Sequence, residues 1–209
     1  MLENDFFKEI QSYIFEMFKN NLKPQVVYHN YIHTLEVVFA ANEIALAEGI
    51  SEDNREIVLL SAWFHDIGFI NGFENHEENS MNIAEIFLIK RSYDSKKIEA
   101  VKTCINATKI PQNPLNIIQK IMCDADLFHL GKESFIEKSN LLRLEWEQIL
   151  GKKLSDIDWL LENEKFVGAH KYFTNYAFTN WSEQKSINWL KLQKELRKAI
   201  AKNDEIEQK

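Results

Sequence analysis

The sequence predicts an all-α fold on three observations. Six glycines and three prolines are few for 209 residues, so loops should be short and β-turns scarce. Apolar residues recur at spacings of three and four along most of the chain, and we find no stretch with the apolar–polar alternation of a half-buried strand. An apolar share of 45% is ordinary for a globular protein and argues against a disordered chain.

The boundaries of the expected helices follow from breaks and stops in the sequence. Residues 3–21 form an amphipathic pattern that ends before Lys23 and Pro24, because proline interrupts a helix. Gly49 and Gly151 are suited to helix C-termini. The expected helices span about residues 3–21, 28–48, 51–66, 75–88, 94–105, 114–123 and 134–150, with two or more further helices between residues 156 and 202.

Capping residues support the same boundaries. Ser51 and Asp94 each precede an apolar-periodic segment, and such side chains accept hydrogen bonds from free N–H groups at a helix start; Ser134 opens the long helix that ends before Gly151. Pro114 suits the first turn of the helix that follows it. Because no linker or repeat divides the chain, we expect one compact helical domain over residues 1–203 and a frayed, charged tail at 204–209.

Charge and cysteine content limit the classes of partner. A formal net charge of −7 argues against a nucleic-acid polymer as ligand, although a local basic pocket for one phosphate remains compatible with it. Cys104 and Cys123 form no CxxC pattern, as in a reduced cytoplasmic protein with structural thiols. The acidic residues 1–5 do not resemble a signal peptide, and no apolar run reaches the ~20 residues of a membrane span. Nothing in the sequence indicates an oligomeric state.

An apolar run over residues 59–64 ends in His65 and Asp66. Burial of an unpaired carboxylate costs several kcal/mol, so Asp66 requires a cation, a hydrogen-bond donor or a metal ion. Adjacent helical side chains diverge by about 100°, which leaves room for one ion between His65 and Asp66. Further ligands must then come from elsewhere in the chain.

Two other pairs are candidates for those ligands. His29 and His33 lie four residues apart on an expected helix, hence on one face. They are either two ligands, one ligand beside an acid–base group, or core-edge histidines bonded to carbonyl groups. Asp124 and Asp126 follow an apolar helix, and either one is a ligand or a cap of the next segment.

The combination of these residues points to a metal site. His33, His65, Asp66 and a late aspartate supply two imidazoles and two carboxylates, each within or at the end of an apolar helix. Such mixed nitrogen and oxygen ligation suits Mn²⁺, Fe²⁺, Co²⁺, Ni²⁺ or Zn²⁺, and suits Mg²⁺ less well.

Four short motifs in this order resemble the HD-domain superfamily of metal-dependent phosphohydrolases. They lie in residues 28–37 (YHNYIHTLEV), 64–68 (FHDIG), 76–80 (HEENS) and 124–127 (DADL). The resemblance covers about residues 25–131 and implies a compact HD-type helical core, with residues 132–203 as a C-terminal helical extension.

The resemblance also implies roles for individual residues. His33, His65, Asp66 and Asp126 would be metal ligands, and Asp66 could bridge to a second ion. The first motif is similar to the opening signature of cyclic-nucleotide phosphodiesterases, in which the first histidine protonates the leaving oxygen. His29 would therefore be a general acid, a role that suits its pKa range.

The chain departs from the full two-metal pattern of the superfamily. His76, with Glu77 beside it, is a candidate for a second ion or for a phosphate, but residues 106–108 contain no histidine where a further one is expected. We therefore expect one tightly held ion and a second that is weakly held. The same gap weighs against the mixed-valence di-iron oxygenases that share the fold.

Other polar residues allow two interpretations. Lys109, in a loop after an apolar helix, is a phosphate-binding cation or a solvated lysine, and Arg143 is a weaker candidate because surface pairs are common on long helices. His170 contacts substrate or is a bonded core histidine. His129 and the aromatic residues of the last third are interpreted as structural.

The leading hypothesis is a metal-dependent phosphohydrolase acting on a small phosphorylated molecule, with a nucleotide as first candidate. The ion would lower the pKa of its water toward ~7 and so supply the nucleophile, with Asp66 and His29 as the catalytic residues. Phosphomonoesters and cyclic phosphodiesters both fit. The alternatives are an HD domain that senses a nucleotide without turnover, suggested by the missing histidine, and a helical interaction domain that binds no metal.

Overall fold

The computed structural model describes residues 5–207 and confirms the all-α prediction. Within that range the chain forms nine α-helices and two short 3₁₀ helices, and it contains no strand. The elements are α1 (Asp5–Asn21), α2 (Tyr31–Ala47), α3 (Glu52–Phe64), η1 (Ile67–Ile70), α4 (His76–Ile89), α5 (Ser95–Ala107), α6 (Ile117–Asp126), η2 (Phe128–Gly131), α7 (Phe135–Leu150), α8 (Asp156–Ala169) and α9 (Asn175–Glu207).

Two helices begin later than the sequence suggested. The side chain of Asn30 accepts hydrogen bonds from the N–H groups of Ile32 and His33, so α2 starts at Tyr31 and the preceding residues lie outside the helix. Asn116 caps α6 in the same way, which leaves Pro114 in the loop rather than in the first turn. In both cases an asparagine side chain replaces the missing intrahelical partner of a free N–H group.

The C-terminal end of the last helix differs from the expectation. α9 continues to Glu207, so residues 204–207 are helical rather than frayed, and residues 208–209 lie outside the described part of the chain. The segment from Lys194 onward is rich in lysine, glutamate and alanine, which have high helix propensity. The expected start of the first helix at Glu3 also falls outside the described residues. None of the described helices is both long and apolar enough to cross a membrane.

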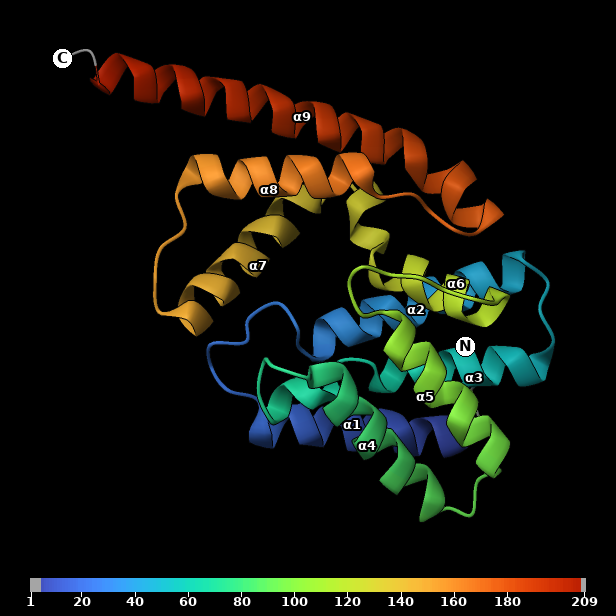
Figure 1. Cartoon of the computed structure of the whole chain (residues 1–209). Coiled ribbons are helices and arrows are strands. Elements are labelled where there is room, and N and C mark those ends of the chain that lie inside the picture. Colours follow the sequence, from blue (N-terminus) through green and yellow to red (C-terminus); the bar gives the residue numbers. More distant parts are fainter. Residues whose placement is uncertain (1–4, 208–209) are drawn as a thin grey trace.

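Helices α1 to α6 form one group around the main hydrophobic core (Figure 1). α2 and α3 pack along each other, and α6 lies against both. Every residue of α3 from Ile57 to Phe64 is buried. This helix therefore ends inside the core, and the residues that follow it, His65 and Asp66, are buried as well.

Helices α7 to α9 form a second layer, in which α8 and α9 run side by side (Figure 1). A smaller apolar cluster joins this layer to η2, and it consists of Leu127, Leu130, Phe135, Val167 and Leu192. The amide of Asn188 on α9 donates to the backbone oxygens of Leu130 and Lys132 at 2.9 and 2.8 Å. The second layer is thus attached to η2, at the end of the helical group α1 to α6, by packing and by hydrogen bonds.

Asp124 makes a further connection between the two layers. Its carboxylate accepts hydrogen bonds from the N–H groups of Phe173 and Thr174 and from the Thr174 hydroxyl. Burial raises the pKa of Asp124 to about 6, although these three donors favour the ionised form. Asp124 lies within α6 and does not cap the segment that follows it, as one of the two interpretations had it; its bonds instead hold residues 173 and 174, which precede α9.

Candidate metal centre

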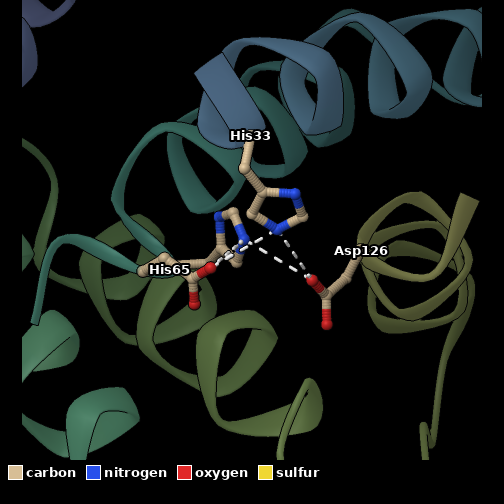
Figure 2. Close-up of side chains that lie close together, drawn as sticks. His33, His65 and Asp126 are labelled. Atoms are coloured by element: carbon tan, nitrogen blue, oxygen red, sulfur yellow. Dashed lines mark ion pairs between the residues drawn. The ribbon is translucent and has the colours of Figure 1, made fainter. Parts of the chain in front are cut away.

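Four side chains from three parts of the chain converge at one point in the core. His33 lies in the first turn of α2, His65 and Asp66 follow α3, and Asp126 is the last residue of α6. One ligand atom from each lies within 4.8 Å of the others. Figure 2 shows that His33, His65 and Asp126 turn toward one another. The structure therefore brings together all four residues nominated as metal ligands.

The distances within this cluster suit a shared cation. His65 Nε2 lies 3.1 Å from Asp66 Oδ2 and 3.6 Å from Asp126 Oδ1. His33 Nε2 lies 3.4 and 3.6 Å from the same two atoms. Ligands bonded at about 2.1 Å are separated by about 3.0 Å at neighbouring octahedral positions and about 3.4 Å in a tetrahedron. The donor atoms are spaced as the ligands of one ion would be.

Several of the nitrogen and oxygen atoms that could bind a metal ion in this cluster are buried without a hydrogen-bond partner. They include His33 Nε2, His65 Nε2 and Asp66 Oδ2. Leaving such a group unsatisfied costs about 1–3 kcal/mol, more when it is charged. His65 Nδ1 donates to the backbone oxygen of Ala62 at 2.8 Å, so the Nε2 lone pair faces the cluster. A divalent ion at this point would satisfy these atoms together.

The charges of the cluster are strongly coupled. Burial alone would lower the pKa of His65, but Asp66 and Asp126 raise it well above its usual range. Burial alone would raise the pKa of Asp66, but the charge of His65 holds it far below its usual range. The pKa of His33 is lowered, mainly by burial. Metal binding requires neutral imidazoles, so an ion that binds here would release any proton that His65 carries.

Comparisons with known proteins identify the domain that carries this cluster. The family model for the HD domain matches residues 30–131, which contain all four residues. Residues 30–131 therefore form an HD domain. A search of the curated proteins gave no match.

Two solved structures share the fold over nearly their whole length. One is a predicted HD superfamily hydrolase from an uncultured Thermotogales bacterium, 20% identical over 91% of each chain, with a TM-score of 0.61. The other is a protein of Lactobacillus plantarum, 15% identical over 96% of this chain and 100% of that one, with a TM-score of 0.71. Together, the HD domain and the buried cluster support a metal-dependent hydrolase.

His29 approaches the four-residue cluster from the loop before α2, not from the helix itself. The expectation that His29 and His33 share a helical face is wrong, because the Asn30 cap excludes His29 from α2. The two rings are nevertheless close, with centroids 5.7 Å apart and planes nearly perpendicular. The turn before the cap thus brings His29 to the cluster by another route.

Glu145 on α7 holds His29 in place. Its carboxylate is fully buried and accepts hydrogen bonds from the N–H groups of Tyr28 and His29 at 2.7 and 3.0 Å, and it also contacts His29 Nδ1. Burial alone would lower the pKa of His29, but the bond to Glu145 and the charges of Asp66, Glu145 and Asp126 raise it. With Nδ1 directed at Glu145, Nε2 is the ring nitrogen available for proton transfer.

Glu145 was not predicted to be a functional residue, although its place in the sequence indicates that it is buried. The residue lies three positions after Leu142 and four before Ile149, on the same face of α7 as the buried Phe135 and Ser139. A carboxylate on the buried face of a helix requires a partner, which is the reasoning that singled out Asp66.

His76 and Glu77 lie beside the four-residue cluster, in the first turn of α4. His76 Nε2 is 3.8 Å from Asp66 Oδ1 and 3.5 Å from Glu77 Oε1, and both side chains are partly exposed. The rings of His29 and His76 both contact Phe69, with centroid distances of 4.3 and 4.1 Å. The two residues nominated for a second ion or a phosphate are therefore placed beside the four-residue cluster.

The two residues predicted to bind substrate, Lys109 and His170, form no bond with the cluster in the described part of the chain. Lys109 is exposed on the loop after α5, and His170 contacts Tyr172 and Lys185 in the C-terminal layer. Within the described part of the chain, no hydrogen bond or ion pair joins Lys109 or His170 to the four cluster residues. A role of Lys109 and His170 in substrate binding stays a prediction.

Arg143 and His129 have structural contacts. The Arg143 guanidinium pairs with Glu147 and Asp156 at 2.9 and 2.8 Å, which links α7 to α8. His129 Nδ1 lies 3.1 Å from the hydroxyl of Tyr28, and burial lowers the pKa of His129 to about 3. A neutral His129 that accepts this bond supports Tyr28, whose ring packs on His33.

Gly68 keeps η1 close to α4, and the change Gly68→Ala is expected to separate them. Gly68 N–H donates to Ser80 Oγ at 2.8 Å, and an added Cβ would collide with the backbone oxygen of His76 and lie 2.7 Å from Ser80 N. We expect a loss of about 1–3 kcal/mol in the free energy of unfolding, measured by urea denaturation. Ser80→Ala, which removes the hydrogen bond but adds no atom, should cost less. Equal stability of Gly68→Ala and the unmodified protein would contradict this packing.

Proposed function

We propose that this HD protein is a metal-dependent phosphohydrolase that cleaves a phosphoester in a small phosphorylated molecule, with a nucleotide as the leading candidate. The observation that carries the proposal is the cluster of His33, His65, Asp66 and Asp126, in which the potential metal-binding atoms His33 Nε2, His65 Nε2 and Asp66 Oδ2 are buried without hydrogen-bond partners. An imidazole suited to acid catalysis, His29, lies beside them. Phosphomonoesters and phosphodiesters are both compatible with this arrangement.

The four cluster residues would hold a divalent ion among Mn²⁺, Fe²⁺, Co²⁺, Ni²⁺, Zn²⁺ and Mg²⁺. Such an ion supplies Lewis-acid chemistry, activating water and neutralising charge on the phosphoryl oxygens. His65 is fixed by its bond to Ala62, so its Nε2 needs no reorientation to bind. Asp66 would use Oδ2 for this ion, and its other oxygen faces His76.

His29 would act as the general acid. Glu145 and the nearby carboxylates raise the pKa of His29, which favours the protonated imidazole, and Glu145 orients the ring through Nδ1. The proton on Nε2 would pass to the leaving oxygen as the bond from phosphorus to that oxygen breaks. Glu145 would not touch the substrate, and its role would be to position His29 and to stabilise its charged form.

A second ion would be held more weakly than the first. The partners available for it are His76, Glu77 and the outer oxygen of Asp66. Asn106, exposed near the end of α5, stands in the region where the superfamily pattern has another histidine. We therefore propose one tight ion, with His76 and Glu77 serving a loosely bound second ion or a phosphate group.

The second candidate function is a sensor that binds metal and nucleotide without turnover. The observation that favours it is the incomplete set of ligands for a second ion around His76. Catalysis that needs two metal ions would then be impaired. It is distinguished from the hydrolase by persistent nucleotide binding with no product over hours.

Metal removal is expected to abolish hydrolysis and to lower thermal stability. The purified protein should carry about one tightly held ion per chain and hydrolyse p-nitrophenyl phosphate, bis(p-nitrophenyl) phosphate or a nucleotide in Mn²⁺, Co²⁺ or Ni²⁺. Chelation should stop the reaction, and the ion should restore it. An ion at about 100 times its Kd stabilises the fold by about 2.7 kcal/mol, which raises the melting temperature.

The outcomes of this experiment separate the three functions. Bound metal without activity on a wide substrate panel would favour the sensor. A protein that retains no metal and shows no thermal shift with any ion would be left as a helical interaction domain.

A further inference from the structure

A cavity of about 230 Å³ lies beside the candidate metal centre, between three segments of the chain. Gln25 and Val26 come from the loop before α2, Phe69 and Phe73 come from η1 and the loop after it, and Gln148 comes from the last turns of α7. The cavity thus combines the HD domain with a helix outside the segment that the family model matches.

The cavity shares a wall with the candidate active site. The ring of Phe69, which lines the cavity, contacts the rings of both His29 and His76. Gln148 and Ile149 line it three and four residues after Glu145, so the face of α7 that holds His29 also faces the cavity. A ligand that fills the cavity would therefore lie next to the general acid.

The lining chemistry favours a flat, apolar ligand with a polar edge. Val26 and Phe69 are buried, at 8% and 1% exposure, and the ring of Phe73 stands edge-on to Phe69 at 6.0 Å. The exposed amides of Gln25 and Gln148 each offer hydrogen-bond donors and an acceptor. The one charged lining residue is Lys23, so a cationic group is disfavoured.

The size of the cavity restricts the ligand further. Pockets for drug-sized molecules occupy about 300–1,000 Å³, so a cavity of about 230 Å³ suits one ring system rather than a large ligand. A nucleobase combines that size with a planar apolar face and with an edge that carries both donors and acceptors. Aromatic side chains bind bases by their faces without requiring one base in particular.

We propose that this cavity is the subsite for a planar heteroaromatic group, of which a nucleobase is the model, in a substrate whose phosphate lies at the metal centre. The proposal rests on the proposed function for the position of the phosphate. It assigns substrate selection to Gln25 and Gln148, which lie outside residues 30–131, and to Phe73 within them.

Binding of unphosphorylated nucleosides tests the subsite without any reaction. Adenosine and uridine would be titrated into the protein by calorimetry and ligand-observed NMR, with and without Mn²⁺. We expect binding that does not require the ion, weakened about fivefold to tenfold in Gln148→Ala and about tenfold or more in Phe73→Ala. Both side chains are exposed, so circular dichroism should show intact folds.

Matched controls come from exposed residues outside this cavity. Asn140→Ala removes another amide of α7, and Phe178→Ala removes another exposed aromatic ring, on α9. Neither residue lines the cavity, so nucleoside affinity should not change. Displacement of the nucleoside by inorganic phosphate alone would mark the cavity as an anion site and overturn the proposal.

A hydrolysis arm separates this proposal from the proposed function. Gln148→Ala and Phe73→Ala should raise KM for adenosine and uridine monophosphates by more than they change KM for glycerol 2-phosphate, which has no ring, whereas Asn140→Ala and Phe178→Ala should change neither. If glycerol 2-phosphate is hydrolysed but neither nucleoside binds and neither variant changes KM, the subsite is refuted and the hydrolase stands. If the nucleosides bind as expected but no phosphoester is cleaved, the hydrolase is refuted and the subsite stands.

Discussion

The change Asp66→Asn is expected to reduce kcat by about 10³-fold or more and to lower the metal content of the purified protein. The Oδ2 atom of Asp66 lies 3.1 and 3.4 Å from the Nε2 atoms of His65 and His33, and its other oxygen faces His76. Asparagine retains the shape of the side chain but removes its charge and one of the two donor oxygens. Metal analysis and hydrolysis of p-nitrophenyl phosphate measure the two effects in one preparation.

Asp124→Asn is the matched control for this variant. Asp124 is also a buried aspartate, but its carboxylate is occupied by the N–H groups of Phe173 and Thr174 rather than by imidazoles. This change should lower the melting temperature while the protein retains its metal and its activity per folded molecule. Full metal content and full activity in Asp66→Asn would contradict the assignment of the metal centre.

The change Glu145→Gln is expected to lower kcat by roughly 10- to 100-fold and to move the alkaline limb of the pH–rate profile to lower pH. Activity requires protonated His29, so it is lost as the pH rises through the pKa of His29. The carboxylate of Glu145 contributes to the raised pKa of His29, and a neutral amide removes that contribution. The profiles of kcat for the two proteins, measured with the same metal, give the direction of the shift.

The leaving group distinguishes a role in acid catalysis from a structural one. An alkyl phosphate needs protonation of its leaving oxygen, whereas p-nitrophenolate leaves readily without it. His29→Asn should therefore cost roughly 10²- to 10⁴-fold on glycerol 2-phosphate and much less on p-nitrophenyl phosphate. Glu145→Gln should add little loss in the His29→Asn background. Equal losses on both substrates would show that the pair maintains the fold rather than the proton transfer.

The four cluster residues were predictable because each is marked by its immediate surroundings. His65 and Asp66 end an apolar helix, and Asp126 ends another, so their need for partners is visible in short segments. His33 follows a capping asparagine at the start of α2. The order of these segments along the chain identified the superfamily, which the match at residues 30–131 confirms.

The geometry around His29 was not predictable to the same degree. The spacing of His29 and His33 is compatible with a continuous helix, but the Asn30 side chain bonds to the N–H groups of Ile32 and His33 and ends the helix there. Side-chain hydrogen bonds of this kind compete with the backbone hydrogen bonds of a helix. The difference in free energy between the two is too small to predict from residue spacing alone. His29 and His33 do lie close together, but the turn before Asn30 brings them together rather than a shared helical face.

The sequence by itself determined the helical class, the superfamily and the four residues of the cluster, because apolar periodicity, helix caps and short motifs are local properties. Only the tertiary structure decided that Asp124 connects two layers while Asp126 joins the cluster. It also paired Glu145 with His29 across 116 residues and placed Gln148 beside Phe69. Such pairs depend on how helices pack, and packing is a property of the assembled core rather than of any one segment.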